Sequence, residues 1–574
     1  MTLQRMVLVC VAAGVAVACF AQGSSSSGGS GGNGGSDSGV SGTGGSIIMD
    51  AGPCERTCSH DLHSIVDCQG NVHATCPSDQ GCDPTTLTCV PACKAAEAAK
   101  ATVGCDFYAF STGWWCHAAF VANTWDSPVR IQLDLDGVPS DASPFARIPQ
   151  GNGKSITYSA LPGGELPPNE VAIVFLSGPK CPPGVTPAGK QSHRAQHITT
   201  SRPVVAYDVL PYGGGDSHVT SASLLIPTAA WDLNYIAVNP WPIGENTFSP
   251  QITITAAEND TEVTIKPLVD IKGGFIEQKQ LPAIPANVPV TYTLQAGQTL
   301  GLSPEQELTG SPILATKRVG VWGMAHCMEI DGCCCDSAHE QLPPVSAWGS
   351  EYAAVRYRDR VDSLPESPPW RIVGAVDGTK LSYDPAPPAG APSIVNQGEV
   401  HTLRAHDPFV VRSQDVHHPF YMASYMTGGQ QFQGAGDPEF VNVIPTQQYR
   451  SEYTFFTDPT YPETNLVFVR ARGSDGKFKA VDLDCFGALT GWQPVDAAGR
   501  YEYTRFDLVR FNFEPQGGCD NGRHQVSSAA PFALTVWGWG NALSYPDVLT
   551  QYGSYAYPAG SSVLPINKVQ VVPR

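Results

Sequence analysis

Short runs of alternating apolar and polar residues, separated by turn residues, follow one another along most of the chain. In Thr261-Glu262-Val263-Thr264-Ile265, alternate side chains point to opposite faces, as in a half-buried strand. Asp377-Gly378 and Asp475-Gly476 supply the residues that tight hairpin turns require. A helical pattern occurs only in ACKAAEAAKA, at 92–101. The pattern therefore predicts an all-β protein.

One spaced set of residues recurs three times: a proline, an aromatic residue four positions later, and a tyrosine eight positions later. Successive copies lie roughly 100 to 120 residues apart, the size of a small domain, so we expect tandem β-sandwich-like repeat units. Buried aromatic residues can pack and also hydrogen-bond through Trp N–H or Tyr O–H, so we interpret this signature as a structural corner that closes each unit. Ligand binding by the signature is the alternative. Its residues are Pro227, Trp231, Tyr235, Pro344, Trp348, Tyr352, Pro445, Tyr449 and Tyr453.

These patterns divide the chain into successive segments. We expect a signal peptide at 1–18, a lipid attachment site and Gly/Ser-rich tether at 19–49, a Cys-rich disulfide module at 50–98, and β units at 99–236, 237–365, 366–460 and 461–574. The fourth unit lacks a complete signature, so we expect it to be atypical, with its C-terminal segment acting as a cap.

The N-terminus has the features of a secretory signal. A single arginine precedes an apolar stretch at 6–18, which is too short to span a bilayer. The small residues before Cys19 resemble a bacterial lipobox, which predicts lipid attachment at Cys19; cleavage after Ala21 is the alternative. The following Gly/Ser-rich stretch is typical of a flexible tether. We expect an exported protein, an outer-membrane lipoprotein or cell-surface protein or otherwise a secreted one, that contacts the membrane through its N-terminal lipid only.

The charge of the chain excludes one class of partner. The formal net charge is −19, and the 34 lysines and arginines are nowhere clustered, whereas a nucleic-acid surface needs an excess of basic residues. Only 15% of residues are charged, and the 58 glycines and 49 prolines fit many short strands and turns. We expect no nucleic-acid partner.

Cysteine usage agrees with export. Of the 18 cysteines, Cys10 lies in the signal and Cys19 is the expected lipid site, which leaves an even number suited to an oxidising compartment. The expected disulfide cysteines are Cys54, Cys58, Cys68, Cys76, Cys82, Cys89, Cys93, Cys105, Cys116, Cys181, Cys327, Cys333, Cys334, Cys335, Cys485 and Cys519.

The first seven of these cysteines crowd into a segment too short to build a sufficient core without cross-links. Because seven is odd, we expect Cys93 to pair outside the module, with Cys105, Cys116 or Cys181. Zinc binding is the alternative, since His60, His63 and His73 lie among these cysteines and Cys/His sets are the usual zinc ligands.

A second Cys/His cluster spans His326 to His339 and includes Cys327 and the consecutive Cys333, Cys334 and Cys335. Thiolates and imidazoles at this density could bind zinc or copper, and a thiolate beside histidine could be a nucleophile. Adjacent cysteines do not easily pair with each other, so we favour disulfides from this loop, one of them to Cys327. By elimination, Cys485 and Cys519 are a plausible pair.

Known catalytic patterns do not survive inspection. A G-x-S-x-G match at 28–32 lies in the tether, without the strand and helix that a nucleophile elbow requires. Gly153-Lys154-Ser155 looks like the end of a phosphate loop, but Ile148 stands where that loop requires glycine. We expect no enzyme, no cofactor, and no metal or catalytic site.

Several segments carry a resemblance that covers about 99–570. They are GCDFYAFST at 104–112, the stretch from Thr199 to Val238, AENDTEVTI at 257–265, ATKRVGVWGMAHCMEI at 315–330, and GSYAYPAG at 553–560. In this order they resemble the IgGFc-binding protein N-terminal domain family, in the form of a bacterial, myxobacterial-type lipoprotein member. The Cys-rich module and the tether lie outside the resemblance.

The resemblance implies an extracellular binding or adhesive module. We therefore predict a non-catalytic cell-surface protein that recognises an extracellular glycan or protein. Recognition of IgG does not carry over, because no residue can be matched to an Fc contact. The alternative is a secreted metal-dependent hydrolase or metal-binding protein that uses the His326 to His339 cluster.

Overall fold

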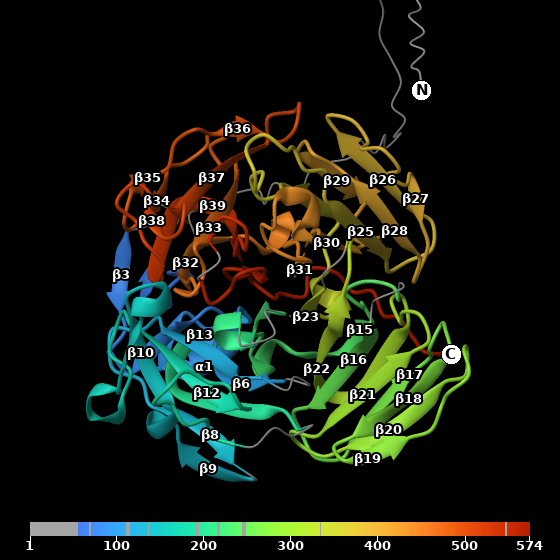
Figure 1. Ribbon diagram of the computed structural model, residues 1–574, viewed down its shortest axis with the longest axis horizontal. Helices are drawn as coiled ribbons and strands as arrows, with labels where there is room; N and C mark the ends of the chain where they lie inside the picture. The colour runs from blue at the N-terminus through green and yellow to red at the C-terminus, as the bar shows by residue number, and fades with distance from the viewer. Residues whose placement is uncertain are drawn as a thin grey trace, which may run out of the picture. The chain divides into compact units, whose positions relative to one another are not determined.

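Antiparallel strands account for almost all regular structure, as the alternating pattern predicted (Figure 1). The computed structural model describes residues 56–67, 71–110, 115–135, 137–189, 194–214, 219–243, 248–332, 335–545 and 548–574. All of them belong to one compact unit spanning Ala51–Arg574. The expected signal peptide, Cys19 and the tether lie outside the described residues. The all-β prediction is confirmed.

The described residues begin with a small Cys-rich part and a helix. The elements are β1 (Thr57–Cys58), β2 (Ser64–Val66), β3 (Val72–Thr75), β4 (Gln80–Asp83), β5 (Thr88–Pro91) and α1 (Ala92–Ala99). β1, β2 and β3 form one small sheet, and β4 pairs with β5. We call the described residues from 56 to 91 the module.

Four groups of strands follow in sequence order (Figure 1). The first group is β6 (Val103–Ala109), β7 (His117–Asn123), β8 (Ile131–Leu135), β9 (Val138–Asp141), β10 (Ala146–Gln150), β11 (Thr157–Ser159), β12 (Val171–Ser177), β13 (Gln196–Leu210) and β14 (Ser221–Leu224). The second is β15 (Asp232–Ile236), β16 (Phe248–Ala256), β17 (Thr261–Ile265), β18 (Ile271–Ile276), β19 (Lys279–Leu281), β20 (Val290–Leu294), β21 (Thr299–Pro304), β22 (Pro312–Met328) and β23 (Asp336–Gln341).

The third and fourth groups complete the chain. The third is β24 (Glu351–Ala354), β25 (Pro369–Gly374), β26 (Thr379–Asp384), β27 (Ile394–Val395), β28 (Val400–Arg404), β29 (Phe409–Ser413), β30 (Phe420–Met426) and β31 (Glu439–Asn442). The fourth is β32 (Arg450–Phe456), β33 (Glu463–Ala471), β34 (Val481–Leu483), β35 (Gly487–Ala488), β36 (Gln493–Pro494), β37 (Tyr501–Arg510), β38 (Glu514–Pro515), β39 (Arg523–Trp539) and β40 (Ser554–Pro558).

A long strand organises three of the four groups. β13, β22 and β39 have 15, 17 and 17 residues, and each pairs with different strands along its length. In the third group the corresponding path is broken into β29 and β30, which belong to two separate four-stranded sheets. The break contains Asp415, whose carboxylate accepts hydrogen bonds from the His417 amide and the His418 ring, ahead of Pro419. This local turn, with a proline that has no N–H to donate, interrupts the strand.

Four short strands, one from each group, form a closed ring. β14, β23, β31 and β40 each pair with the apolar strand before them, namely β13, β22, β30 and β39. β14 contacts β23 and β40, and β31 contacts the same two strands. The groups are thus arranged around these strands as blades surround the axis of a β-propeller.

Apolar clusters join each group to its neighbours around the ring. Tyr108 and Phe110 of the first group pack with Trp231 and Trp322 of the second. One large cluster joins the second and third groups, and Tyr357 and Met426 of the third pack with Trp537 of the fourth. The fourth group returns to the first through a cluster that includes Phe120 and Phe456, whose ring centroids are 4.7 Å apart. The groups therefore share their cores.

The structure corrects the expected place of the signature. The strands that carry its three tyrosines pair with the group that follows: β15 with β22, β24 with β29, and β32 with β39. The interpretation of the signature as a corner that closes each unit is therefore wrong. Each copy opens the next group, because its tyrosine hydrogen-bonds to a later strand of that group.

The C-terminal segment joins the two ends of the ring. The Thr102 amide donates to the Ser561 carbonyl at 2.9 Å, and the Val563 amide donates to the Lys100 carbonyl at 2.8 Å. The expectation of a cap is therefore wrong, because β40 is a ring strand and the residues after it pair with the start of the first group. The three signature copies lie between successive groups, and this pairing of 100–102 with 561–563 joins the fourth group to the first, where no signature copy occurs.

Candidate functional site

A cavity of about 180 Å³ lies where the module meets the first and fourth groups. The module contributes His60 to His63, and the loop after β7 contributes Trp125 and Asp126. The fourth group contributes Arg450 and Glu452 from β32, and Arg523 from the start of β39. Several ionisable side chains from distant parts of the sequence therefore line one partly open cavity, which is typical of a binding site.

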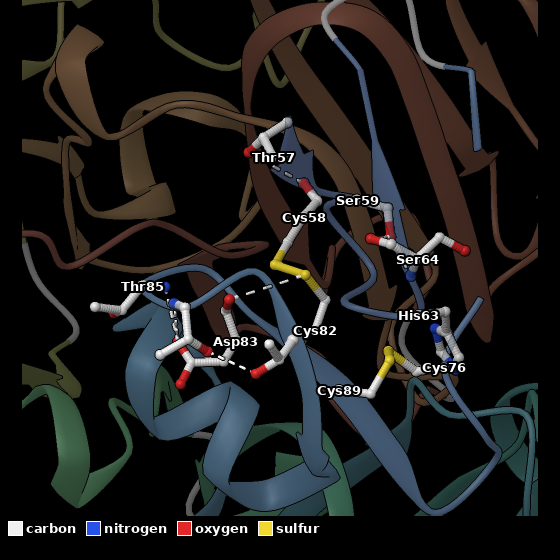
Figure 2. The surroundings of a disulfide bond; sticks show 12 residues. Thr57, Cys58, Ser59, His63, Ser64, Cys76, Cys82, Asp83, Thr85 and Cys89 are labelled. Carbon is white, nitrogen blue, oxygen red and sulfur yellow. Dashed lines mark hydrogen bonds between the residues drawn. A yellow bond between two sulfur atoms is a disulfide. The ribbon is translucent and has the colours of Figure 1, made fainter. Parts of the chain in front are cut away.

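Two disulfides stabilise the module internally, and one tryptophan of the first group packs against it. Figure 2 shows the bonds Cys58–Cys82 and Cys76–Cys89, which cross-link the module. Its small apolar cluster includes Leu62 and three alanines of α1, and is completed by Trp125 from the first group. The Trp125 indole N–H donates to the Ser78 carbonyl at 2.7 Å. The module therefore depends on the first group for its core.

His63 and Asp61 form a polarised pair at the module side of the cavity. The Asp61 carboxylate accepts from the His63 amide and the Ser59 hydroxyl. Burial acts to raise the pKa of Asp61, but the interactions with His63 and Ser59 outweigh it and hold this pKa at about 2. Burial acts to lower the pKa of His63, and the carboxylates of Asp61 and Asp126, 3.4 and 3.8 Å from its ring nitrogens, raise it overall. The imidazole is buried with no hydrogen bond from either nitrogen to the described residues.

Arg450 enters the cavity without a carboxylate partner. Its guanidinium donates to the His60 carbonyl at 3.2 Å, and none of the described carboxylates lies within ion-pair distance of it. Burial lowers the pKa of Arg450, and the nearby Tyr453 and Glu452 oppose this only in part. The loss of solvent around the Arg450 cation therefore outweighs the favourable interactions with the groups near it.

Arg523 is in a similar position on the neighbouring strand. Its Nη2 donates to Asn169 Oδ1 at 3.0 Å, and its Nη1 lies 3.9 Å from the Asp484 carboxylate. Its Nε is buried and makes no hydrogen bond to the described residues. Burial lowers the pKa of Arg523, with Asp484 as the main opposing charge.

Glu452 lies near both arginines, but its carboxylate accepts from the Gln525 amide instead. Burial raises the pKa of Glu452, because the neutral form is favoured where water is excluded. The cavity thus combines two poorly compensated guanidinium groups with acids that are held by other donors.

Most of the expected disulfide cysteines are bonded in the structure. Besides the two module bonds, the pairs are Cys93–Cys105, Cys116–Cys181, Cys327–Cys335 and Cys485–Cys519. Cys54, Cys68, Cys333 and Cys334 lie outside the described residues. The bonded sulfurs are not thiolates, so they cannot serve as the metal ligands that the zinc alternative requires.

The His326 to His339 cluster does not converge on one point among the described residues. Cys327 is bonded to Cys335, and His339 in β23 is buried with its Nε2 3.7 Å from Asp208. Burial lowers the pKa of His339. Within the described ranges, the one set of three such ligand atoms that converges is Asp484, Cys485 and His524, and its cysteine is in a disulfide. Nothing in this geometry favours the hydrolase alternative.

The signature residues lie in the protein interior. The Trp231 and Trp348 indole N–H groups donate to the Ile226 and Pro343 carbonyls, five positions earlier in each case. Tyr235, Tyr352 and Tyr453 each accept from an amide three positions earlier and donate to a carbonyl of a later strand. The aromatic signature residues are all buried, including Tyr449.

Sequence reasoning missed the arginines of the cavity. One signal was present: Arg450 occupies a position of the third signature copy where the other copies have Asp232 and Gly349. An arginine there stands out, because the other two copies carry an acidic residue and a glycine at this position. Arg523 and Trp125 had no comparable signal, since only the fold brings them to the module.

Comparison with known proteins identifies the family. The family model described as IgGFc binding protein matches residues 221–538, from β14 to β39. The human (Homo sapiens) protein named IgGFc-binding protein is 22% identical over 334 residues, which are 56% of this chain but 6% of the human protein. The chain therefore spans a small part of that relative's length. Among the described residues, no helix is long and apolar enough to cross a bilayer. Because the family model covers more than half of its residues, the chain belongs to the IgGFc-binding protein family.

Proposed function

We propose that this protein is an exported, non-catalytic binding protein that recognises an extracellular glycan or protein through the cavity between the module and the ring. The observation that carries the proposal is the pair of guanidinium groups that line this cavity: Arg450 has no carboxylate within ion-pair distance among the described residues, and the buried Nε of Arg523 makes no hydrogen bond to them. A folded protein gains no stability from such groups, so their presence in a cavity favours a binding role. Membership in the family supports the non-catalytic, extracellular part of the proposal.

An array screen with the full chain tests this proposal. Glycans and extracellular proteins are presented on one surface, and binding is measured for the wild-type chain and for Arg450→Met. We expect specific binders whose signal falls in the variant. Retained wild-type binding by the variant, or no binder in either class, would contradict the proposal. Because IgG Fc gives the human relative its name, purified Fc belongs on the array as one protein among many.

We propose that the protein is anchored through lipid on Cys19, with residues 19–49 as a tether that presents the rest of the chain. The motif before Cys19 and the Gly/Ser composition support this. Labelling cells with a lipid precursor checks it: label on the wild-type chain and none on Cys19→Ala is the expected result. Unlabelled wild-type protein, cleaved after Ala21, would refute anchoring and leave a secreted protein.

We also propose that the chain consists of repeat units whose boundaries fall just before each signature proline. The pairing of each signature strand with the following group supports boundaries near 226, 343 and 444, in place of those expected from sequence. Limited proteolysis tests whether a unit is stable by itself. We expect no stable single-unit fragment, because neighbouring groups share apolar clusters. A stable isolated unit would contradict these shared cores.

Elemental analysis and a thiol count of the non-reduced protein test the metal-dependent alternative directly. We expect no stoichiometric zinc or copper and essentially no free thiol, because the described cysteines are in disulfides. One metal ion per chain, lost together with a hydrolytic activity on chelation, would favour the alternative.

A further inference from the structure

We infer that the cavity binds the carboxylate of an acidic sugar, and that Arg450 and Arg523 are the residues that hold it. The inference rests on the proposed binding function and names the chemical class of the ligand. It starts from the two guanidinium groups that face the cavity from β32 and β39.

Each of these guanidinium groups has unused hydrogen-bonding capacity. The Arg450 guanidinium bonds to one carbonyl oxygen, and the buried Arg523 Nε bonds to none of the described residues. Two buried arginines of this protein have a carboxylate partner: Arg360 lies 2.9 Å from the Glu366 carboxylate, and Arg371 lies 2.7 Å from Glu307. A carboxylate entering the cavity would give Arg450 a partner of the kind that Arg360 and Arg371 have within the chain, and would give Arg523 a second one besides Asp484, which lies 3.9 Å from its Nη1.

The acids that line the cavity do not fill this role. Asp61 accepts from Ser59 and from the His63 amide, and Glu452 accepts from Gln525. The third acid, Asp126, lies 3.8 Å from the His63 ring, and among the described residues none of the three lies within ion-pair distance of either arginine. The acids of the cavity therefore leave both guanidinium groups able to bind an external anion.

The groups around the arginines favour a sugar over a simple anion. Asp126, at the mouth, has a side chain that is 59% exposed and can accept hydrogen bonds from hydroxyl groups. Asn169 accepts from Arg523 through Oδ1, and its amide nitrogen makes no hydrogen bond to the described residues, so it can donate to a ligand.

The size of the cavity limits the ligand to a small group. About 180 Å³ is less than the roughly 300 to 1,000 Å³ typical of pockets for drug-sized molecules, so one sugar ring is the unit that fits. A further cavity of about 230 Å³ lies beside α1; there Lys94 lies 2.7 Å from Glu97, and Arg318 lies 3.8 Å from Glu258. Its one arginine thus has a carboxylate within ion-pair distance, whereas Arg450 in the module cavity has none among the described residues.

Calorimetric titration of the full chain tests the inference, with D-glucuronic acid and D-glucose as probes that differ at one carboxylate. We expect glucuronate to bind at least about tenfold more tightly than glucose, and its affinity to fall as salt is added. Arg450→Met and Arg523→Met should each weaken glucuronate binding by at least about tenfold. Arg472→Met is the matched control, because the exposed Arg472 does not line the cavity and donates to the Gly499 and Gly476 carbonyls instead.

Melting temperatures separate binding from folding in the same variants. Loss of an uncompensated cation should leave the melting temperature of Arg450→Met equal to or above that of the wild type. A marked fall in melting temperature together with lost binding would assign Arg450 a structural role and overturn the inference.

The remaining outcomes distinguish the inference from the function on which it rests. If the array yields binders but glucuronate and glucose bind equally, or neither binds, the acidic-sugar inference fails and the binding function stands. If the array yields no binder at all, the proposed function itself fails. Binding of inorganic sulfate as tight as that of glucuronate would replace the sugar with a general anion site and overturn the inference.

Discussion

The backbone amide of Arg450 donates a hydrogen bond of 3.0 Å to the hydroxyl of Tyr453. Tyr453 is the last residue of the third signature copy, and its hydroxyl donates in turn to the Phe532 carbonyl of β39. The third signature copy therefore fixes the start of β32, where the Arg450 side chain lines the cavity. A repeated structural device thus positions one residue of the candidate site.

Replacement of the signature tyrosines by phenylalanine tests this device. Tyr235→Phe, Tyr352→Phe and Tyr453→Phe each remove a buried hydroxyl that accepts from an amide and donates to a carbonyl. We expect each to lower the free energy of unfolding by about 1 to 3 kcal/mol, measured by urea denaturation. Tyr292→Phe is the control, because the Tyr292 hydroxyl makes no hydrogen bond to the described residues. An equal loss in the control would refute the role of the corner.

The same variants differ in what they predict for binding. Tyr453→Phe should also weaken binding of the array ligands, because it releases the backbone of Arg450. Tyr235→Phe opens the second group, which contributes no residue to the cavity, and should leave binding unchanged.

Thr102→Val tests the closure of the ring. The Thr102 hydroxyl accepts from the Ser561 amide at 2.9 Å and donates to the Ser561 carbonyl at 3.2 Å. Valine keeps the shape but leaves the buried amide without its acceptor, so we expect a loss of about 1 to 3 kcal/mol in thermal or urea unfolding. Thr264→Val removes the exposed Thr264–Thr291 hydrogen bond as the matched control and should cost less than about 1 kcal/mol. A smaller effect at Thr102 than at Thr264 would contradict the importance of the closure.

Asp437, just before β31, should make stability depend on pH. Burial raises the pKa of Asp437 from 3.8 to about 7, although the Gly429 amide and Arg360 act in the opposite direction. The unfolded chain ionises this group near its ordinary pKa, whereas the folded chain keeps it protonated, so stability is complete below about pH 4 and is lost as the pH rises through about 7. The difference amounts to at most about 4 kcal/mol.

Urea unfolding between pH 4 and 8 measures this loss, and Asp437→Asn should make the profile flatter. Asp336, Glu340 and Glu439 lie in the same ring, and burial raises the pKa of each, so they act in the same direction and keep some slope in the variant. Stability that rises with pH over this range, in the wild type and the variant alike, would refute the assignment.

Trp125→Ala should release the module without opening the ring. The side chain completes the apolar cluster of the module and bonds to Ser78, so its removal should cost the module about 3 to 5 kcal/mol. We expect rapid proteolysis within 56–91 and an almost unchanged melting temperature of the β region. Trp348 lies in the cluster of the second and third groups. We expect Trp348→Ala to lower the melting temperature of the β region and to leave proteolysis within 56–91 almost unchanged. Identical proteolysis patterns for the two variants would contradict the separate role of Trp125.

Local pattern was enough to predict the strands and the recurrence of the signature, because alternation and turn residues act over a few residues. Burial of the signature aromatics was also expected, because side chains as large as those of Trp231 and Tyr235 bury a large apolar area in a core. The partner of each signature was not predictable, because the pairing of β15 with β22 joins residues more than 70 positions apart. The contact between Thr102 and Ser561 closes the ring only if all four groups are arranged correctly around the axis. No single segment of the sequence shows this arrangement.

The candidate site was beyond sequence reasoning for the same reason. Its residues come from about 60, 125, 169, 450 and 523 in the chain, and each is unremarkable alone. The clusters that the sequence pattern favoured as sites are rich in cysteine, and their described cysteines are in disulfides. A charged residue becomes informative only when burial and the absence of a partner are known, as for Arg450.

Hydrogen exchange of the full chain, with and without the strongest array binder, tests the central claim most directly. We expect slowed exchange in 60–63, 124–126 and 450–454, the segments that line the cavity, with little change elsewhere in the described residues. Slowed exchange confined to other segments, such as the loops of the second and third groups, would contradict a ligand site at the module cavity.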